Sequence, residues 1–180
     1  KIRAHPVSQQ GFTMFIDLIL PVSMFMSMLA WALVAKWYLY PHLLRQSFVN
    51  ALLPLLFIHC FRSVGLMFLI PGVTAEVLDP RFALPAAYGD LIAVILAFIS
   101  IVLLKWNVRA GTLSIWLFNI WGLLDLINAV VRGIMYVPNG SFGATYWIPG
   151  SYVPFLLITH ILIFILLLKP KNRFAWITKE

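Results

Sequence analysis

The chain has 180 residues, of which 62% are apolar and 11% are charged, whereas soluble domains are roughly 45–50% apolar and about 25% charged. This composition excludes a water-soluble globular protein, because too few polar side chains remain to cover its surface. The net charge of +7 does not indicate nucleic-acid binding, because the basic residues lie mostly between and after apolar runs.

Five apolar runs approach or exceed the roughly 20 residues that a helix needs to cross a bilayer. They cover residues 12–35, 48–70, 85–104, 112–135 and 152–168. Their residues do not alternate between polar and apolar types, as transmembrane β-strands would. We therefore expect residues 1–180 to form one integral membrane domain, an all-α transmembrane bundle of five helices.

The first run is too long for the core of a signal peptide, and no small-residue cleavage pattern follows it. We expect it to remain in the protein as an anchor. Pro21 removes the amide that would bond the carbonyl of Asp17, so this helix either bends there or has that carbonyl satisfied by a neighbour or by water.

Each run carries polar side chains that are expensive in lipid and usually face the interior of a bundle. Counted at 1.5 Å per residue, the ionisable ones lie about 8–17 Å from the same end of the bundle. We take as candidates for a buried ligand-binding or polar network Asp17, His59, Arg62, Asp90, Trp121, Asp125, Asn128 and His160.

Helical spacing predicts how these residues face. His59, Arg62 and Ser63 share one side of an α-helix, and a second stripe holds Trp121, Asp125, Asn128 and Arg132. Both stripes can point inward at once. Trp121 is suited either to stacking on a ligand or to packing.

The acids outnumber the permanent cation in this layer. The layer holds three acids, Asp17, Asp90 and Asp125, and one permanent cation, Arg62. His59 and His160 are the other candidate partners for the acids. An unpaired carboxylate in a medium of low dielectric constant takes up a proton, pairs with a protonated histidine or binds a cation.

Three interpretations remain open. Arg62 pairs with Asp125 or Asp90 while the histidines bond Asn128 or the backbone, and the network only holds the bundle together. Alternatively, His59, His160, Asp90 and Asp125 hold a metal ion, or the two histidines ligate haem. Finally, histidine and aspartate residues form a proton relay or transport path.

The distribution of lysine and arginine predicts the orientation. One side of the membrane receives Lys36, Arg45, Lys105, Arg109, Lys169, Lys171, Arg173 and Lys179, and the other receives Lys1, Arg3, Arg81 and Arg132. The more basic side should be cytoplasmic, which places the amino terminus outside and the carboxyl terminus inside. The outer connections, residues 71–84 and 136–151, either cap a site that opens outward or only mark turns.

No nucleotide-binding, hydrolase or CxxC motif is present, and the single cysteine, Cys60, excludes an internal disulfide. The segments FIHCFRSVGLMFLIPGV, AAYGDLIAVILA, FNIWGLLDLINA and GATYWIPGSYVPFLLITHILIF resemble those of small bacterial multi-pass membrane proteins of undetermined function. That resemblance implies no activity.

We therefore expect a non-catalytic accessory or ligand-binding subunit of a larger assembly in the bacterial inner membrane, with a buried polar pocket in the outer half. Its partners would be lipids and other membrane subunits or further copies of itself, and not nucleic acid. A metal- or haem-binding protein in redox chemistry or ion transfer is the alternative.

Overall fold

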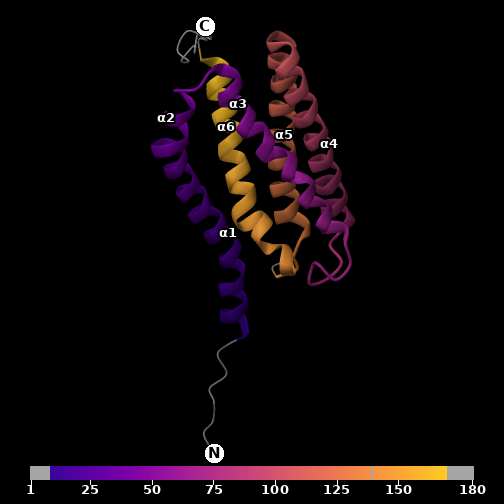
Figure 1. Ribbon diagram of the computed structural model, residues 1–180. Coiled ribbons are helices and arrows are strands. Elements are labelled where there is room, and N and C mark those ends of the chain that lie inside the picture. The colour runs from indigo at the N-terminus through magenta and orange to yellow at the C-terminus, as the bar shows by residue number, and fades with distance from the viewer. Residues whose placement is uncertain (1–8, 139, 170–180) are drawn as a thin grey trace, which may run out of the picture.

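The computed structural model describes residues 9–138 and 140–169, with side chains from residue 18 onward, and every regular element in these ranges is helical. Five helices in this part of the chain are long and apolar enough to cross a membrane (Figure 1). The prediction of an all-helical bundle is thereby confirmed for the described residues. The five helices cover Leu18–Leu43, Phe48–Leu69, Pro80–Trp106, Val108–Tyr136 and Gly143–Leu168.

The first apolar helix is longer than the sequence predicts. It comprises α1 (Gln9–Val34), the π-helical turn η1 (Ala35–Leu39) and α2 (Tyr40–Leu43). A π turn accommodates an extra residue without ending a helix. The predicted end at residue 35 is therefore wrong by eight residues.

The second helix changes type half-way along. Ser47 accepts a hydrogen bond from the amide of Asn50 and begins α3 (Phe48–Cys60), which continues as the 3₁₀ helix η2 (Phe61–Leu69). Runs of 3₁₀ helix longer than three or four residues are uncommon, so η2 is an unusual element.

Capping side chains set the starts of the two longest helices. The Asp79 carboxylate accepts a hydrogen bond from the Arg81 amide at 2.8 Å and begins α4 (Pro80–Trp106). Asn107 accepts bonds from two amides and begins α5 (Val108–Tyr136). Both helices start earlier than the apolar runs predict, because the caps precede them. The last described elements are η3 (Gly143–Tyr146), η4 (Ile148–Tyr152) and α6 (Val153–Leu168).

The central helices pack closely, whereas α1 lies at the side. α4 packs along α5 and against α3 and η2, and α6 packs against α3 and α5. α1 contacts α6 and η4 (Figure 1). Large apolar side chains remain exposed on α1, for example Phe25 at 67%. A lipid environment accounts for such exposure, because lipid tails are as apolar as these side chains.

Two apolar clusters fill the bundle, one towards each end. The first includes Leu56, Phe118 and Leu162, and the second includes Phe68, Phe82, Leu126, Phe142 and Leu156. On α3–η2, α5 and α6 the buried polar residues other than Ser114 lie along the chain between these two clusters. The polar layer is therefore enclosed by apolar packing on both sides.

Candidate functional site

The 3₁₀ geometry of η2 selects the residues that point into the bundle. A 3₁₀ helix has three residues per turn, so every third side chain lies on the same side. Arg62, Gly65 and Phe68 follow this period and are buried, whereas Ser63 is exposed. The expectation that Ser63 shares the inner face with His59 and Arg62 is wrong, because it assumed α-helical spacing.

Arg62 is fully buried and is the centre of the polar layer. Its Nε donates to Asp90 Oδ1 at 2.6 Å, and its Nη2 donates to Asp125 Oδ2 at 2.6 Å. Its Nη1 donates to the carbonyl of Gly122 at 3.2 Å and lies 3.3 Å from His160 Nε2. One guanidinium therefore binds both aspartates at once, where the sequence predicted one or the other.

Three glycines make room for these charged groups. A Cβ at Gly65 would lie 2.0 Å from Asp90 Oδ2, and a Cβ at Gly89 would lie 1.7 Å from Asp125 Oδ1. A Cβ at Gly122 would lie 2.6 Å from the His160 ring and 2.9 Å from Arg62 Nη1. The network can form because these three positions, one each on η2, α4 and α5, carry no side chain.

Hydrogen bonds determine how the imidazole of His160 is oriented. Asn119 Nδ2 donates to the carbonyl of His160 at 3.1 Å, which leaves Asn119 Oδ1 facing His160 Nδ1 at 2.7 Å. Because an amide oxygen only accepts, the proton of a neutral imidazole lies on Nδ1. His160 Nε2 is then free to accept from Arg62. We define the Arg62 network as Arg62, Asp90, Asp125, Asn119 and His160.

His59 lies next to this network and has a different partner. Thr159 Oγ1 lies 2.8 Å from the carbonyl of Leu156, to which it donates, and 3.1 Å from His59 Nε2. His59 Nε2 therefore carries the proton, and its buried Nδ1 has no hydrogen-bond partner among the described residues. The expected bonds from the histidines to Asn128 are wrong; Asn119 and Thr159 take that place.

The remaining candidates lie away from the centre. Trp121 is 42% exposed, and its Nε1 lies 3.5 Å from the carbonyl of Gly89, so the predicted inward position is wrong. Asn128 accepts a bond from Arg132 at 2.9 Å. The side chain of Asp17 lies outside the described part of the chain.

The geometry gives no support to a metal site in the described residues. No group of three or more histidine, cysteine, aspartate or glutamate side chains is placed to hold a metal ion there. Asp90 and Asp125 both bind Arg62, and the rings of His59 and His160 lie in contact, with centroids 4.2 Å apart. This contact leaves no room for a haem between the two imidazoles.

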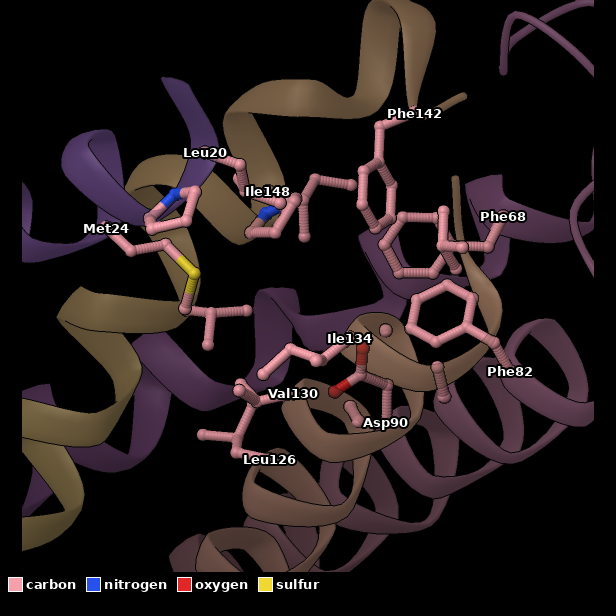
Figure 2. A pocket seen from close by; sticks show the side chains of 17 residues that line it. Leu20, Met24, Phe68, Phe82, Asp90, Leu126, Val130, Ile134, Phe142 and Ile148 are labelled. Atoms are coloured by element: carbon pink, nitrogen blue, oxygen red, sulfur yellow. The ribbon is translucent and has the colours of Figure 1, made fainter. Parts of the chain in front are cut away.

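An apolar cavity of about 320 Å³ adjoins the network (Figure 2). On α4, Phe82, Ala86 and Asp90 recur every four residues and line one wall. The other walls come from α1, η2, α5, η4 and α6. Among the described lining residues, Asp90 is the only charged one, and Figure 2 shows its carboxylate among apolar side chains. Sequence reasoning identified Asp90 and expected a buried polar pocket, whereas the described lining of this cavity is apolar apart from Asp90.

The connection that follows η2 and the connection that follows α5 are joined beside this cavity. The Ala75 amide donates to the carbonyl of Ser141 at 3.1 Å, and the Ala144 amide donates to the carbonyl of Val73 at 3.2 Å. Ser141 Oγ also donates to Glu76 Oε1. Phe142, from the second connection, lines the cavity. The second connection therefore contributes to the cavity wall, and the first connection is hydrogen-bonded to it.

Comparison with known proteins matches a family model to most of the chain. A family model described as a domain of unknown function (DUF8737) matches residues 19–168. This range contains the whole Arg62 network, His59 and all the residues that line the cavity. No curated protein and no solved structure matches the chain.

Proposed function

The chain belongs to the DUF8737 family, a domain of unknown function, and we propose that it binds an apolar or amphiphilic molecule taken from the lipid bilayer. The observation that carries this proposal is the cavity beside Asp90. Its volume of about 320 Å³ falls at the lower end of the roughly 300–1,000 Å³ of small-molecule sites. Such sites are mostly apolar with a few polar groups that fix orientation, as here.

The side position of α1 supports entry from the lipid. α1 packs on α6 and η4, whereas α5 packs on α4 and α6. The cavity is lined both by Leu20 and Met24 of α1 and by Val130 and Ile134 of α5. Ile134 is 80% exposed. A molecule dissolved in the bilayer would therefore reach the cavity between α1 and α5 without crossing the polar layer.

We further propose that the cavity lies in the outer half of a bacterial inner membrane. Five described basic residues flank the opposite end of the helices, namely Lys36, Arg45, Lys105, Arg109 and Lys169. The end near the cavity has Arg81 and Arg132. The positive-inside rule then favours an amino terminus outside the cell and a carboxyl terminus in the cytoplasm.

We propose a binding subunit and not an enzyme. The described lining of the cavity offers one carboxylate and no hydroxyl, thiol or imidazole group. The exposed apolar surface of α1 suits contact with lipid, with other membrane subunits or with a second copy of the chain. Gentle extraction from membranes that yields only monomers without a partner would contradict the proposed assembly.

Photolabelling tests the binding proposal. The purified protein in lipid nanodiscs is irradiated with a photoactivatable analogue of octanol, and labelled residues are mapped by mass spectrometry. We expect labelling of Met24, Val130 and Ile134 that excess octanol suppresses. Labelling of Ile95, a lipid-facing residue that is 51% exposed, should not be suppressed. Equal behaviour of the two groups would contradict a discrete site.

A cavity-filling variant provides the matched comparison. Gly133 lines the cavity, and a Cβ there would lie 3.6 Å from Phe82, an ordinary contact distance. Gly133→Leu should therefore fold, occupy the cavity and abolish the suppressible labelling. Ala30→Leu, at an exposed position of α1 outside the cavity, should leave it unchanged. Persistent suppressible labelling in Gly133→Leu would place the binding site elsewhere.

A further inference from the structure

We propose that the molecule bound in this cavity is a monovalent organic cation, an ammonium group attached to a hydrocarbon body, and that Asp90 is its counter-ion. This inference rests on the proposed function. It adds the charge and the chemical class of the ligand.

The Arg62 network contains more negative than positive charge. Asp90 and Asp125 both form ion pairs with Arg62, and no other lysine or arginine among the described residues pairs with them. With neutral imidazoles, the network holds two negative charges and one positive charge. A buried surplus charge is unfavourable unless a proton or a cation compensates it.

Asp90 is the residue of the Arg62 network that lines the cavity. Asp90 lines the cavity and its side chain is 13% exposed, whereas the side chains of Arg62 and Asp125 are 0% and 7% exposed and do not line it. Asp90 Oδ1 is bound to Arg62 Nε, while Oδ2 lies against Gly65 and accepts no hydrogen bond from the described residues. Asp90 therefore retains capacity to accept a bond or ion pair from a ligand.

Three aromatic rings that line the same cavity also favour a cation. Phe68, Phe82 and Phe142 line the cavity and lie with ring centroids 5.3–5.9 Å apart. Figure 2 shows them grouped on one side of the cavity, and Phe82 lies two turns before Asp90 on α4. Aromatic faces attract organic cations. A cavity lined by both a carboxylate and aromatic rings suits an ammonium head, and the remaining apolar wall suits its hydrocarbon chain.

The geometry disfavours a bare metal ion as this cation. Among the described lining residues, Asp90 supplies the only carboxylate, and its Oδ1 is bound to a guanidinium. Calcium takes about six to eight oxygen ligands, and magnesium requires an octahedral set. An organic ammonium needs far fewer, because most of its surface contacts apolar groups.

Competition between matched amphiphiles tests the inference. Octyltrimethylammonium, octanol and octyl sulfate are compared at equal membrane-bound concentrations for suppression of labelling by the photoactivatable octanol analogue. We expect the cation to suppress labelling at a concentration at least about tenfold below that of octanol, and the sulfate to be the weakest of the three. Equal potency of cation and octanol would overturn the inference while leaving the proposed function intact. Absence of any suppressible labelling would overturn both.

Asp90→Asn tests the role of the counter-ion. Asparagine retains an oxygen that accepts from Arg62 Nε, and the variant leaves Arg62 and Asp125 balanced one to one, so we expect it to fold. Its preference for the cation over octanol should fall to about threefold or less, with binding of octanol retained. An unchanged preference would overturn the role of Asp90. Asp79→Asn is the matched control, because it removes the same charge outside the cavity and asparagine also caps helices.

A second variant keeps the test independent of Asp90. Phe82→Leu retains an apolar side chain but removes an aromatic face. We expect a weaker preference for the cation and little change for octanol. Equal weakening for both ligands would show that Phe82 contributes only packing, and the aromatic part of the inference would be wrong.

Discussion

Arg62 is the residue on which the polar layer depends. Its guanidinium is the only described group that binds both buried carboxylates, and it also bonds the Gly122 carbonyl. Removing one partner of a buried ion pair costs much more stability than replacing both partners with apolar side chains, because the remaining charge is left uncompensated. The two sides of this network should therefore respond unequally to mutation.

Arg62→Leu should lower the free energy of unfolding by about 3–5 kcal/mol, because Asp90 and Asp125 lose their only described cation. Asp125→Asn should reduce it less, since Arg62 then pairs with Asp90 alone. Denaturant titration in mixed micelles measures both. Adding Asp90→Asn and Asp125→Asn to Arg62→Leu should recover part of the loss. Equal losses in the two single variants would contradict the shared pairing.

The glycines of α5 provide a second comparison within one helix. Gly122→Ala places a Cβ 2.6 Å from the His160 ring, whereas Gly133→Ala places one 3.6 Å from Phe82. Overpacking costs about 1–3 kcal/mol, and alanine gains up to about 1 kcal/mol of helix propensity over glycine. We expect Gly122→Ala to lower the midpoint of thermal unfolding and Gly133→Ala to leave it unchanged or raise it. The reverse order would contradict the proximity of His160 to Gly122.

At the scale of single elements, the sequence predicts length better than helix type. Apolar runs and Pro residues are visible in sequence, so the five helices could be predicted with errors at their ends. The 3₁₀ geometry of η2 could not, because nothing in the residues 61–69 distinguishes a three-residue turn from an α-helical one. That difference places Ser63 outside and Gly65 beside Asp90.

Residue spacing shows which side chains share a face of a helix, but it does not show whether that face is buried. Trp121 and Asp125 are one turn apart on α5, yet Asp125 is buried and Trp121 is 42% exposed. The burial of Asp125 could be predicted from the cost of a charge in lipid. Asn119 and Thr159 were not identified as histidine partners, because uncharged polar residues within apolar runs give a weaker signal.

The start of α4 gives a prediction about pH. Hydrogen bonds from the Arg81 side chain and amide lower the pKa of Asp79 from 3.8 to about 2. A depressed pKa contributes stability above the unfolded value, and this contribution is lost as pH falls through the folded value. The cap should therefore persist at pH 3 and be lost near pH 2. Carboxyl NMR titration checks this, and Arg81→Gln should raise the midpoint towards 3.8.

At the scale of the whole molecule, polar and apolar layers alternate along the bundle. The Arg62 network lies between two apolar clusters, and the cavity occupies the cluster nearer the joined connections. That ionisable residues from several helices meet in one layer could be predicted, because each is costly alone. A buried pocket could be expected for the same reason, but its apolar lining could not be predicted, since that depends on how α1 lies against α6 and η4.

The joined connections should determine how well the cavity is enclosed. Gly143 has a φ of +51°, and a Cβ there would lie 2.5 Å from the Ala75 amide nitrogen. Gly143→Ala should therefore separate the two connections and speed hydrogen exchange at the amides of Ala75 and Ala144, with α3 unaffected. Exchange measured by mass spectrometry checks this. Unchanged protection of both amides would contradict the pairing.

The side position of α1 has a consequence for how the protein is put together. α1 packs against α6 and η4, whereas α3, η2, α4, α5 and α6 pack against one another. Two separate polypeptides, residues 1–46 and 47–180, should therefore reassociate when they are produced in the same membrane. The larger fragment would keep its buried arginine and both aspartates in place. It would lose the α1 wall that separates the cavity from the surrounding lipid, together with the core residues Ala35 and Leu43.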